Sequence, residues 1–105
     1  MNNKNRSSDK EHELYQAILQ LKTPEECYHF FVDLCTVSEL KAMEQRFQVA
    51  RMLSRGMIYH DILERTGASS ATISRVNRAL NYGSDGYATV MARLDEAEEN
   101  GGQDA

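Results

Sequence analysis

The sequence has no run of about 18 apolar residues, the length at which a segment is read as a membrane-spanning helix. Its first residues are polar and lack the apolar core of a secretory signal peptide. We therefore expect a cytoplasmic protein with no membrane partner. Runs in which β-branched and polar residues alternate are also absent, so no segment is predicted to form a strand and we expect an all-α fold.

Residue types that bind metals or perform catalysis are few and scattered. The two cysteines, Cys27 and Cys35, lie within an apolar helical pattern and match no zinc spacing. The three histidines lie far apart, and the chain has no HExxH or CxxC motif, no nucleophile elbow and no glycine-rich phosphate loop. We therefore expect no catalytic residue, no metal and no cofactor, and we do not expect an enzyme.

Charge is distributed unevenly along the chain. The formal net charge of −4 argues against a nucleic-acid partner, because phosphate neutralisation supplies most non-specific affinity. Residues 39–82 nevertheless carry seven Lys or Arg against four Asp or Glu, a local balance of +3, whereas residues 83–105 carry one against six. This modest excess predicts weak non-specific binding to DNA and a greater dependence on specific contacts made by a symmetric dimer.

Helix-start and helix-stop signals divide the chain into six predicted helices. The polar residues 1–9 are predicted to be disordered, the helical domain to span 10–95, and the acidic, glycine-containing tail over 96–105 to be disordered. Thr23 and Thr36 each precede a glutamate by three positions, which is the pattern of a capping box. The apolar face of the helix after Thr23 is too dense for one small domain to cover, so we expect a homodimer.

The segment over about 58–80 predicts a helix-turn-helix. Two short helical patterns flank Gly67, which is expected to end the first of them. The residues expected to pack the two helices together are Ile62, Leu63, Thr66, Ala68, Ile73 and Val76. An ordinary helical hairpin needs the same glycine stop, serine cap and apolar spacing, so this pattern alone leaves that alternative open.

The outward face of the second short helix distinguishes the two interpretations. A surface helix of an ordinary bundle carries many long charged side chains, whereas this one carries small polar residues that allow a helix to enter the DNA major groove. We expect Ser70, Ala71, Thr72 and Ser74 to approach base edges. The full set of predicted DNA-binding residues is Ser69, Ser70, Ala71, Thr72, Ser74, Arg75, Arg78 and Lys41, of which the last three are expected to favour phosphates.

Six helices, with a long third one running into a helix-turn-helix, resemble the Trp repressor family. The resemblance covers most of residues 10–95 and is sharpest from Thr36 through LKAMEQRFQVARMLSRG to GASSATISRVNRAL. The stretch ATISRVNRALNYG resembles the YerC/YecD branch of that superfamily. The resemblance implies a six-helix, intertwined, all-α homodimer that regulates transcription, as a repressor of biosynthetic genes. Its two recognition helices would enter successive major grooves of double-stranded DNA about 34 Å apart, at a near-palindromic operator.

The resemblance also implies an amino-acid corepressor, held between the long third helix and the recognition helix. The matching positions in this chain are Thr36, Arg46 and Arg75, and a guanidinium can both stack on a planar ring and clamp a carboxylate. Val76 replaces a glycine of Trp repressors, and Ala79 replaces a serine. A different small effector, or none, is therefore as consistent with the sequence as tryptophan. The two arginines are equally consistent with a phosphate contact or an intersubunit ion pair.

A second interpretation belongs to another functional class. The helix-turn-helix could have lost DNA reading and could serve as a helical protein–protein interaction module, which the acidic tail and the negative net charge favour.

Overall fold

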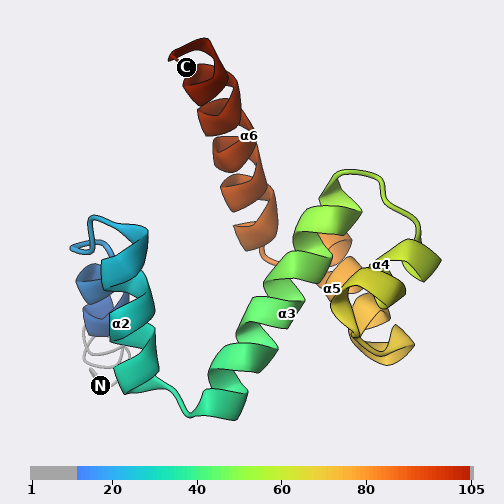
Figure 1. The fold of residues 1–105 in the computed structure, drawn as a ribbon, viewed down its shortest axis with the longest axis horizontal. Coiled ribbons are helices and arrows are strands. Elements are labelled where there is room, and N and C mark those ends of the chain that lie inside the picture. The colour runs from blue at the N-terminus through green and yellow to red at the C-terminus, as the bar shows by residue number, and fades with distance from the viewer. Residues whose placement is uncertain (1–11, 105) are drawn as a thin grey trace, which may run out of the picture. The chain divides into compact units, whose positions relative to one another are not determined.

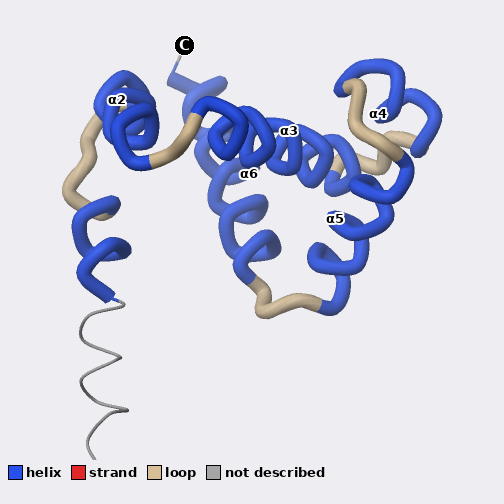
Figure 2. The backbone as a smooth tube through the Cα atoms, turned by 90° about the horizontal axis from the view of Figure 1, so that it is seen from below, coloured by secondary structure: helices blue, strands red, loops and turns tan. Residues whose placement is uncertain are grey.

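Every regular element in the part of the chain that the computed structural model describes, residues 12–104, is a helix (Figures 1 and 2). A helical segment over 12–18 is followed by α2 (Pro24–Leu34), α3 (Val37–Ser54), α4 (Tyr59–Thr66), α5 (Ser70–Tyr82) and α6 (Gly86–Asp104). The all-α prediction is thus confirmed over the described residues. The segment 1–9, predicted to be disordered, lies outside them. None of the described helices is long and apolar enough to cross a membrane.

Threonine caps begin α2 and α3, as the sequence predicts. The Thr23 hydroxyl accepts a hydrogen bond from the Glu26 N–H at 3.1 Å, and Pro24 occupies the first turn of α2. At the start of α3 the Glu39 N–H donates to the Thr36 hydroxyl at 3.1 Å, while the Thr36 N–H donates to the Glu39 carboxylate at 2.8 Å. These bonds satisfy donors that a helix start leaves without intrahelical partners.

The described chain divides between Leu40 and Lys41 into two compact units. This boundary falls inside α3 and differs from the single helical domain expected over 10–95. Among its described residues, 12–40, the first unit contains no buried side chain, in α2 or elsewhere. Leu34 of α2 keeps 51% of its surface exposed in the single chain. The described residues of the first unit therefore leave the dense apolar face of α2 partly exposed.

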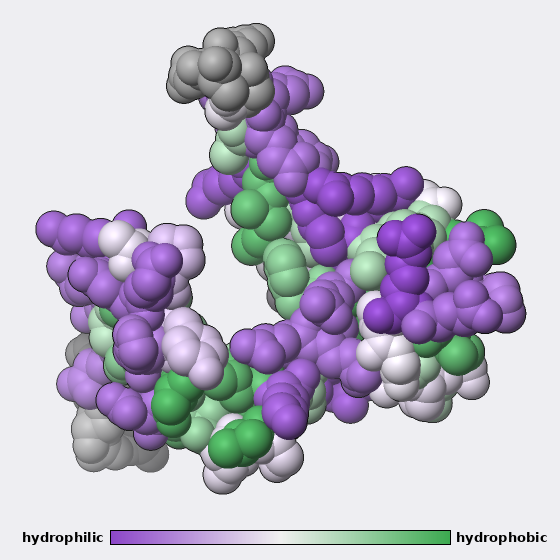
Figure 3. Space-filling view, in the orientation of Figure 1, coloured by the Kyte–Doolittle hydropathy of each residue, from purple (hydrophilic) through white to green (hydrophobic). Residues whose placement is uncertain are grey.

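The second unit contains the core. The C-terminal half of α3 contributes two residues, and α4 and α5 pack beside it (Figure 1). The buried residues are Val49, Ala50, Ile62, Ala68, Ile73, Val76 and Met91. The prediction that Leu63 packs inward was wrong, because its side chain is 41% exposed. Helix α6 carries exposed apolar surface on its N-terminal half, where Val90 and Leu94 lie (Figure 3).

Helix α6 continues to Asp104, so the prediction of a disordered tail over 96–105 was wrong for residues 96–104, and residue 105 lies outside the described residues. The Arg51 guanidinium of α3 pairs with Asp95 at 2.9 Å and with Glu98 at 3.1 Å. Arg55 pairs with the same Glu98 carboxylate at 2.7 Å. Partial burial opposes the charged form of Arg51, but hydrogen bonds and attraction from the two carboxylates outweigh it and raise the pKa of the guanidinium. These tertiary ion pairs hold α6 to α3 beyond residue 95.

Helix α5 ends at Tyr82, and a glycine at position 83 follows it as the C-cap. The Gly83 N–H donates to the Ala79 carbonyl at 2.9 Å. A Cβ on Gly83 would collide with that same carbonyl oxygen, and backbone atoms cannot give way as a flexible side chain can.

We expect Ile62→Ala to lower the free energy of unfolding by about 2–5 kcal/mol, because the wholly buried side chain leaves a cavity among four helices. The matched control is Ile58→Ala, whose side chain is 63% exposed and whose loss should change stability by no more than about 0.5 kcal/mol. Urea denaturation followed by circular dichroism measures both. Equal losses in the two variants would contradict this assignment of the core.

Candidate nucleic-acid interface

The turn between α4 and α5 depends on one left-handed residue. Gly67 has φ +72° and ends α4, with its N–H donating to the Leu63 carbonyl at 2.9 Å. Thr66 closes the turn from the other side. Its hydroxyl donates to the Ile62 carbonyl at 2.8 Å and accepts from the Ala68 N–H at 3.1 Å. The N–H groups of Gly67 and Ala68 are therefore paired, which fixes the course of the turn into α5.

Ser69 caps the start of α5. Its hydroxyl accepts from the Thr72 N–H at 3.1 Å and lies 3.1 Å from the Thr72 hydroxyl, to which it donates. Both side chains were predicted to contact DNA, and in the structure they form a hydrogen bond with each other at the start of α5. The cap satisfies the Thr72 N–H, which the start of the helix leaves without an intrahelical partner.

The two faces of α5 differ sharply in burial. Ile73 is fully buried and Val76 is 2% exposed, so this row fixes the rotation of α5 about its axis. The predicted DNA-binding residues of this region that are exposed are Ser69, Ser70, Ala71, Ser74, Arg75 and Arg78. Thr72 is half-buried. Because a helix presents residues three and four apart on one side, packing of Ile73 and Val76 turns Ala71 and Ser74 outward, while Ser70 is exposed at the first position of the helix.

The outward face of α5 is positively charged. Helix α5 contains Arg75 and Arg78 and no Asp or Glu, and its first turn is free of acidic side chains. Neither arginine forms a salt bridge with any residue in the described part of the chain. The two guanidiniums lie three positions apart and therefore share one side of the helix, and the N-terminal end of α5 adds the partial positive charge of its dipole. This face is therefore able to attract an anionic backbone such as that of DNA.

A side chain of α3 fastens the helix-turn-helix to the core. The Gln45 side-chain amide donates to the Thr66 carbonyl at 3.1 Å, and both residues are partly buried. The bond satisfies a carbonyl at the end of α4 that has no intrahelical partner. The sequence analysis missed Gln45, because nothing in the local pattern of α3 distinguishes this glutamine from a solvated one.

The remaining predicted site residues lie away from α5. Lys41 is exposed on α3, and no hydrogen bond or ion pair among the described residues links it to α5. Arg46, also on α3, is half-buried, whereas Arg75 is exposed. Thr36 belongs to the first unit, and its hydroxyl caps α3. An effector site built from Thr36, Arg46 and Arg75 therefore stays a prediction.

The described residues show no group of three or more His, Cys, Asp or Glu side chains that could hold a metal ion.

Comparison with protein families matches residues 9–95 to the model of the Trp repressor protein family. The protein YerC of Bacillus subtilis, itself uncharacterised, is 55% identical over 86 residues, which is 82% of this chain and 83% of YerC.

Two solved structures are similar to the chain as a whole. A candidate Trp repressor from Staphylococcus aureus superposes with a TM-score of 0.80 at 45% identity, covering 90% of this chain and 95% of that protein. A TrpR-like protein from Eubacterium eligens superposes with a TM-score of 0.79 at 53% identity, covering 89% and 96%. The all-α, Trp-repressor-like fold that the sequence resemblance implied is thereby confirmed.

Proposed function

This chain belongs to the Trp repressor family, a family of DNA-binding regulators rather than enzymes, and on that premise we propose that it is a dimeric transcriptional repressor of biosynthetic genes. It reads a near-palindromic operator in double-stranded DNA. Because its relatives are bacterial, its place of action is the cytoplasm, where the chromosome lies.

This proposal rests on the exposed side chains in the first turns of α5. Ser70, Ala71 and Ser74 are exposed, none is longer than a serine, and no acidic side chain of α5 repels a phosphate. A recognition helix needs this combination, because base edges in the major groove are reached by short side chains only when the backbone approaches closely. Arg75 and Arg78 supply the phosphate contacts that position the helix.

A second copy of the chain completes the repressor. Helix α2 has no buried residue within the single chain, and Leu34 at its end is half exposed. An unpaired apolar face of this kind favours association, since burial contributes about 25 cal/mol for each Å² removed from water. A symmetric dimer would present its two α5 helices about 34 Å apart, one helical turn of DNA.

The effector, if the repressor uses one, differs from tryptophan. Val76 belongs to the core and is 2% exposed, so its side chain occupies space where Trp repressors have only a glycine hydrogen. Ala79 offers no hydroxyl to a ligand amine. Arg46 and Arg75 are then available for another small amino acid or for phosphate contacts.

A helical protein–protein interaction module is the second candidate function. The net charge of −4 and the acidic side chains of α6 favour it. Selection of bound fragments from the organism's own genome, at low salt and with or without added amino acids, separates the two functions. A repressor enriches a small set of related fragments, whereas an interaction module enriches none, and that result would refute the proposed function.

We expect the full chain to sediment as a dimer, and Leu34→Glu to sediment as a monomer at the same concentration, because a charge would be buried in the interface. Asn81→Glu, which adds the same charge at an exposed position of α5, should remain a dimer. Analytical ultracentrifugation measures all three. A monomeric parent protein, or a dimeric Leu34→Glu variant, would exclude an interface on this face.

We expect Arg78→Gln to weaken binding on every DNA sequence and to reduce the slope of log affinity against log salt by about 1, since one phosphate contact is lost. Arg93→Gln removes the same charge from an exposed position of α6 and should leave the slope unchanged. Fluorescence anisotropy over a salt series measures both. Equal slopes for the two variants would contradict the assigned role of Arg78.

We expect Thr72→Ala to weaken binding at particular base pairs by about 1–3 kcal/mol while leaving other operator variants unaffected. The cap on α5 survives this change, because Ser69 accepts from the backbone N–H of residue 72. Binding to a set of single-base operator variants measures the effect, with Thr89→Ala in α6 as the control. A uniform loss on all variants would assign Thr72 to phosphate or to helix stability instead.

A further inference from the structure

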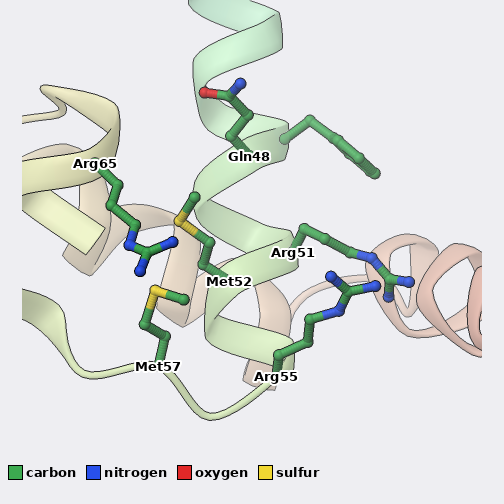
Figure 4. Close-up of a pocket in the computed structure, with 7 residues that line it drawn as sticks. Gln48, Arg51, Met52, Arg55, Met57 and Arg65 are labelled. Carbon is green, nitrogen blue, oxygen red and sulfur yellow. The ribbon is translucent and has the colours of Figure 1, made fainter. Parts of the chain in front are cut away.

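A pocket of about 260 Å³ opens between α3, the loop after it and α4 (Figure 4). It belongs entirely to the second unit and shares no residue with the predicted effector set of Thr36, Arg46 and Arg75. Its lining residues are Phe47, Gln48, Arg51, Met52, Arg55, Met57 and Arg65. Three of these are cations and none is an acid.

The three arginines of the pocket are not equivalent. Arg51 and Arg55 are compensated by Asp95 and Glu98, and Figure 4 shows both guanidiniums turned toward α6. Arg65 extends from α4 toward Met52 and Met57, and forms no salt bridge with any residue that the structure describes. Arg65 is therefore the cation that can accept an external anion.

The rest of the wall is apolar and adaptable. Met52 and Met57 present flexible, polarisable thioethers, and Phe47 presents an aromatic ring that is 39% exposed. The carbon stems of Arg51 and Arg55 extend this surface while their charged ends lie elsewhere. A ligand that fits this wall has an apolar body as well as a negative charge.

We propose that this pocket binds a small organic anion, a carboxylate on a compact aromatic or branched aliphatic body, with Arg65 holding the carboxylate and Met52 and Met57 contacting the body. The planar guanidinium suits a carboxylate because it donates two parallel hydrogen bonds. Ligand pockets usually measure about 300–1,000 Å³, so a volume of about 260 Å³ admits a molecule of amino-acid size and excludes a dinucleotide.

The position of the pocket gives its ligand a way to act on DNA binding, a step that rests on the proposed function. Arg65 belongs to α4, the first helix of the helix-turn-helix, whereas Met52 belongs to α3. A ligand held by both helices would bind one orientation of α4 on α3 better than others, and would shift the population toward it. The pocket thus acts as an effector site separate from the one that the family resemblance implies.

The test uses the full chain with its methionine methyl groups labelled with ¹³C, and phenylacetate as the probe. Met52 and Met57 line the pocket and Met43 and Met91 do not. We expect phenylacetate to move the Met52 and Met57 signals saturably and to leave the Met43 signal nearly in place; Met91 is not a control, because its sulfur lies 3.6 Å from the Arg51 guanidinium. Phenylacetamide, which lacks the charge, and acetate, which lacks the apolar body, should bind at least about tenfold more weakly.

Arg65→Gln should weaken phenylacetate binding at least about tenfold, because the charge-assisted hydrogen bonds are lost. Arg93→Gln, which removes a charge outside the pocket, should keep the parental affinity. The proposal is overturned if phenylacetamide binds as well as phenylacetate, or if the two variants bind equally. It is also overturned if the Met52 and Met57 signals respond to protein concentration and not to phenylacetate, because the occupant is then a second copy of the chain.

These titrations contain no DNA, so their outcome does not depend on whether the chain is a repressor. The regulatory step is measured separately, as operator affinity with and without saturating phenylacetate, in the parent protein and in Arg65→Gln. We expect a change in the parent that the variant lacks. Equal operator affinities in the presence and absence of phenylacetate would refute that step.

Discussion

The second unit depends on one small core to which four helices each contribute one or two side chains. Val49 and Ala50 come from α3, Ile62 from α4, and Met91 from α6, while α5 contributes its own pair. Because the core is this small, each of its buried side chains contributes a large share of the packing. The rotation of α5, and with it the set of residues that faces outward, follows directly from the packing of its two buried residues.

Charges are separated by sign within the same unit. Asp95 and Glu98 of α6 are held by Arg51 and Arg55 of α3, whereas α5 carries cations and no acid. The negative net charge of the chain therefore says little about the charge on the outward face of α5. Acids that are neutralised within the molecule contribute little to the field at α5, since opposite charges in contact cancel over distances longer than their separation.

Local signals in the sequence were sufficient for most of the fold. The caps at Thr23, Thr36 and Ser69 and the stop at Gly67 depend on residues within four positions, so a pattern can predict them. The extension of α6 was missed because Asp95 pairs with a residue more than forty positions earlier. The acidic composition of the end of α6 is typical of a disordered tail. It does not indicate that Asp95 and Glu98 pair with Arg51 of α3.

As with the fold, the sequence predicts those features of the candidate site that depend on residues close together along the chain. The outward residues of α5 follow from helical periodicity, whereas the bond from Gln45 to the Thr66 carbonyl and the pocket beside Arg65 join separate helices. The wrong prediction for Leu63 has a related cause. Helical periodicity indicates which residues share a face, but it does not indicate how far a neighbouring helix covers that face.

Gly83 limits which residues the observed end of α5 accepts. A side chain at this position would strike the carbonyl oxygen of Ala79, so a substitution at residue 83 requires the backbone itself to shift. The exposed residues of α5 carry no such restriction, because their side chains face away from the core. The end of α5 is therefore less tolerant of substitution than its outward face.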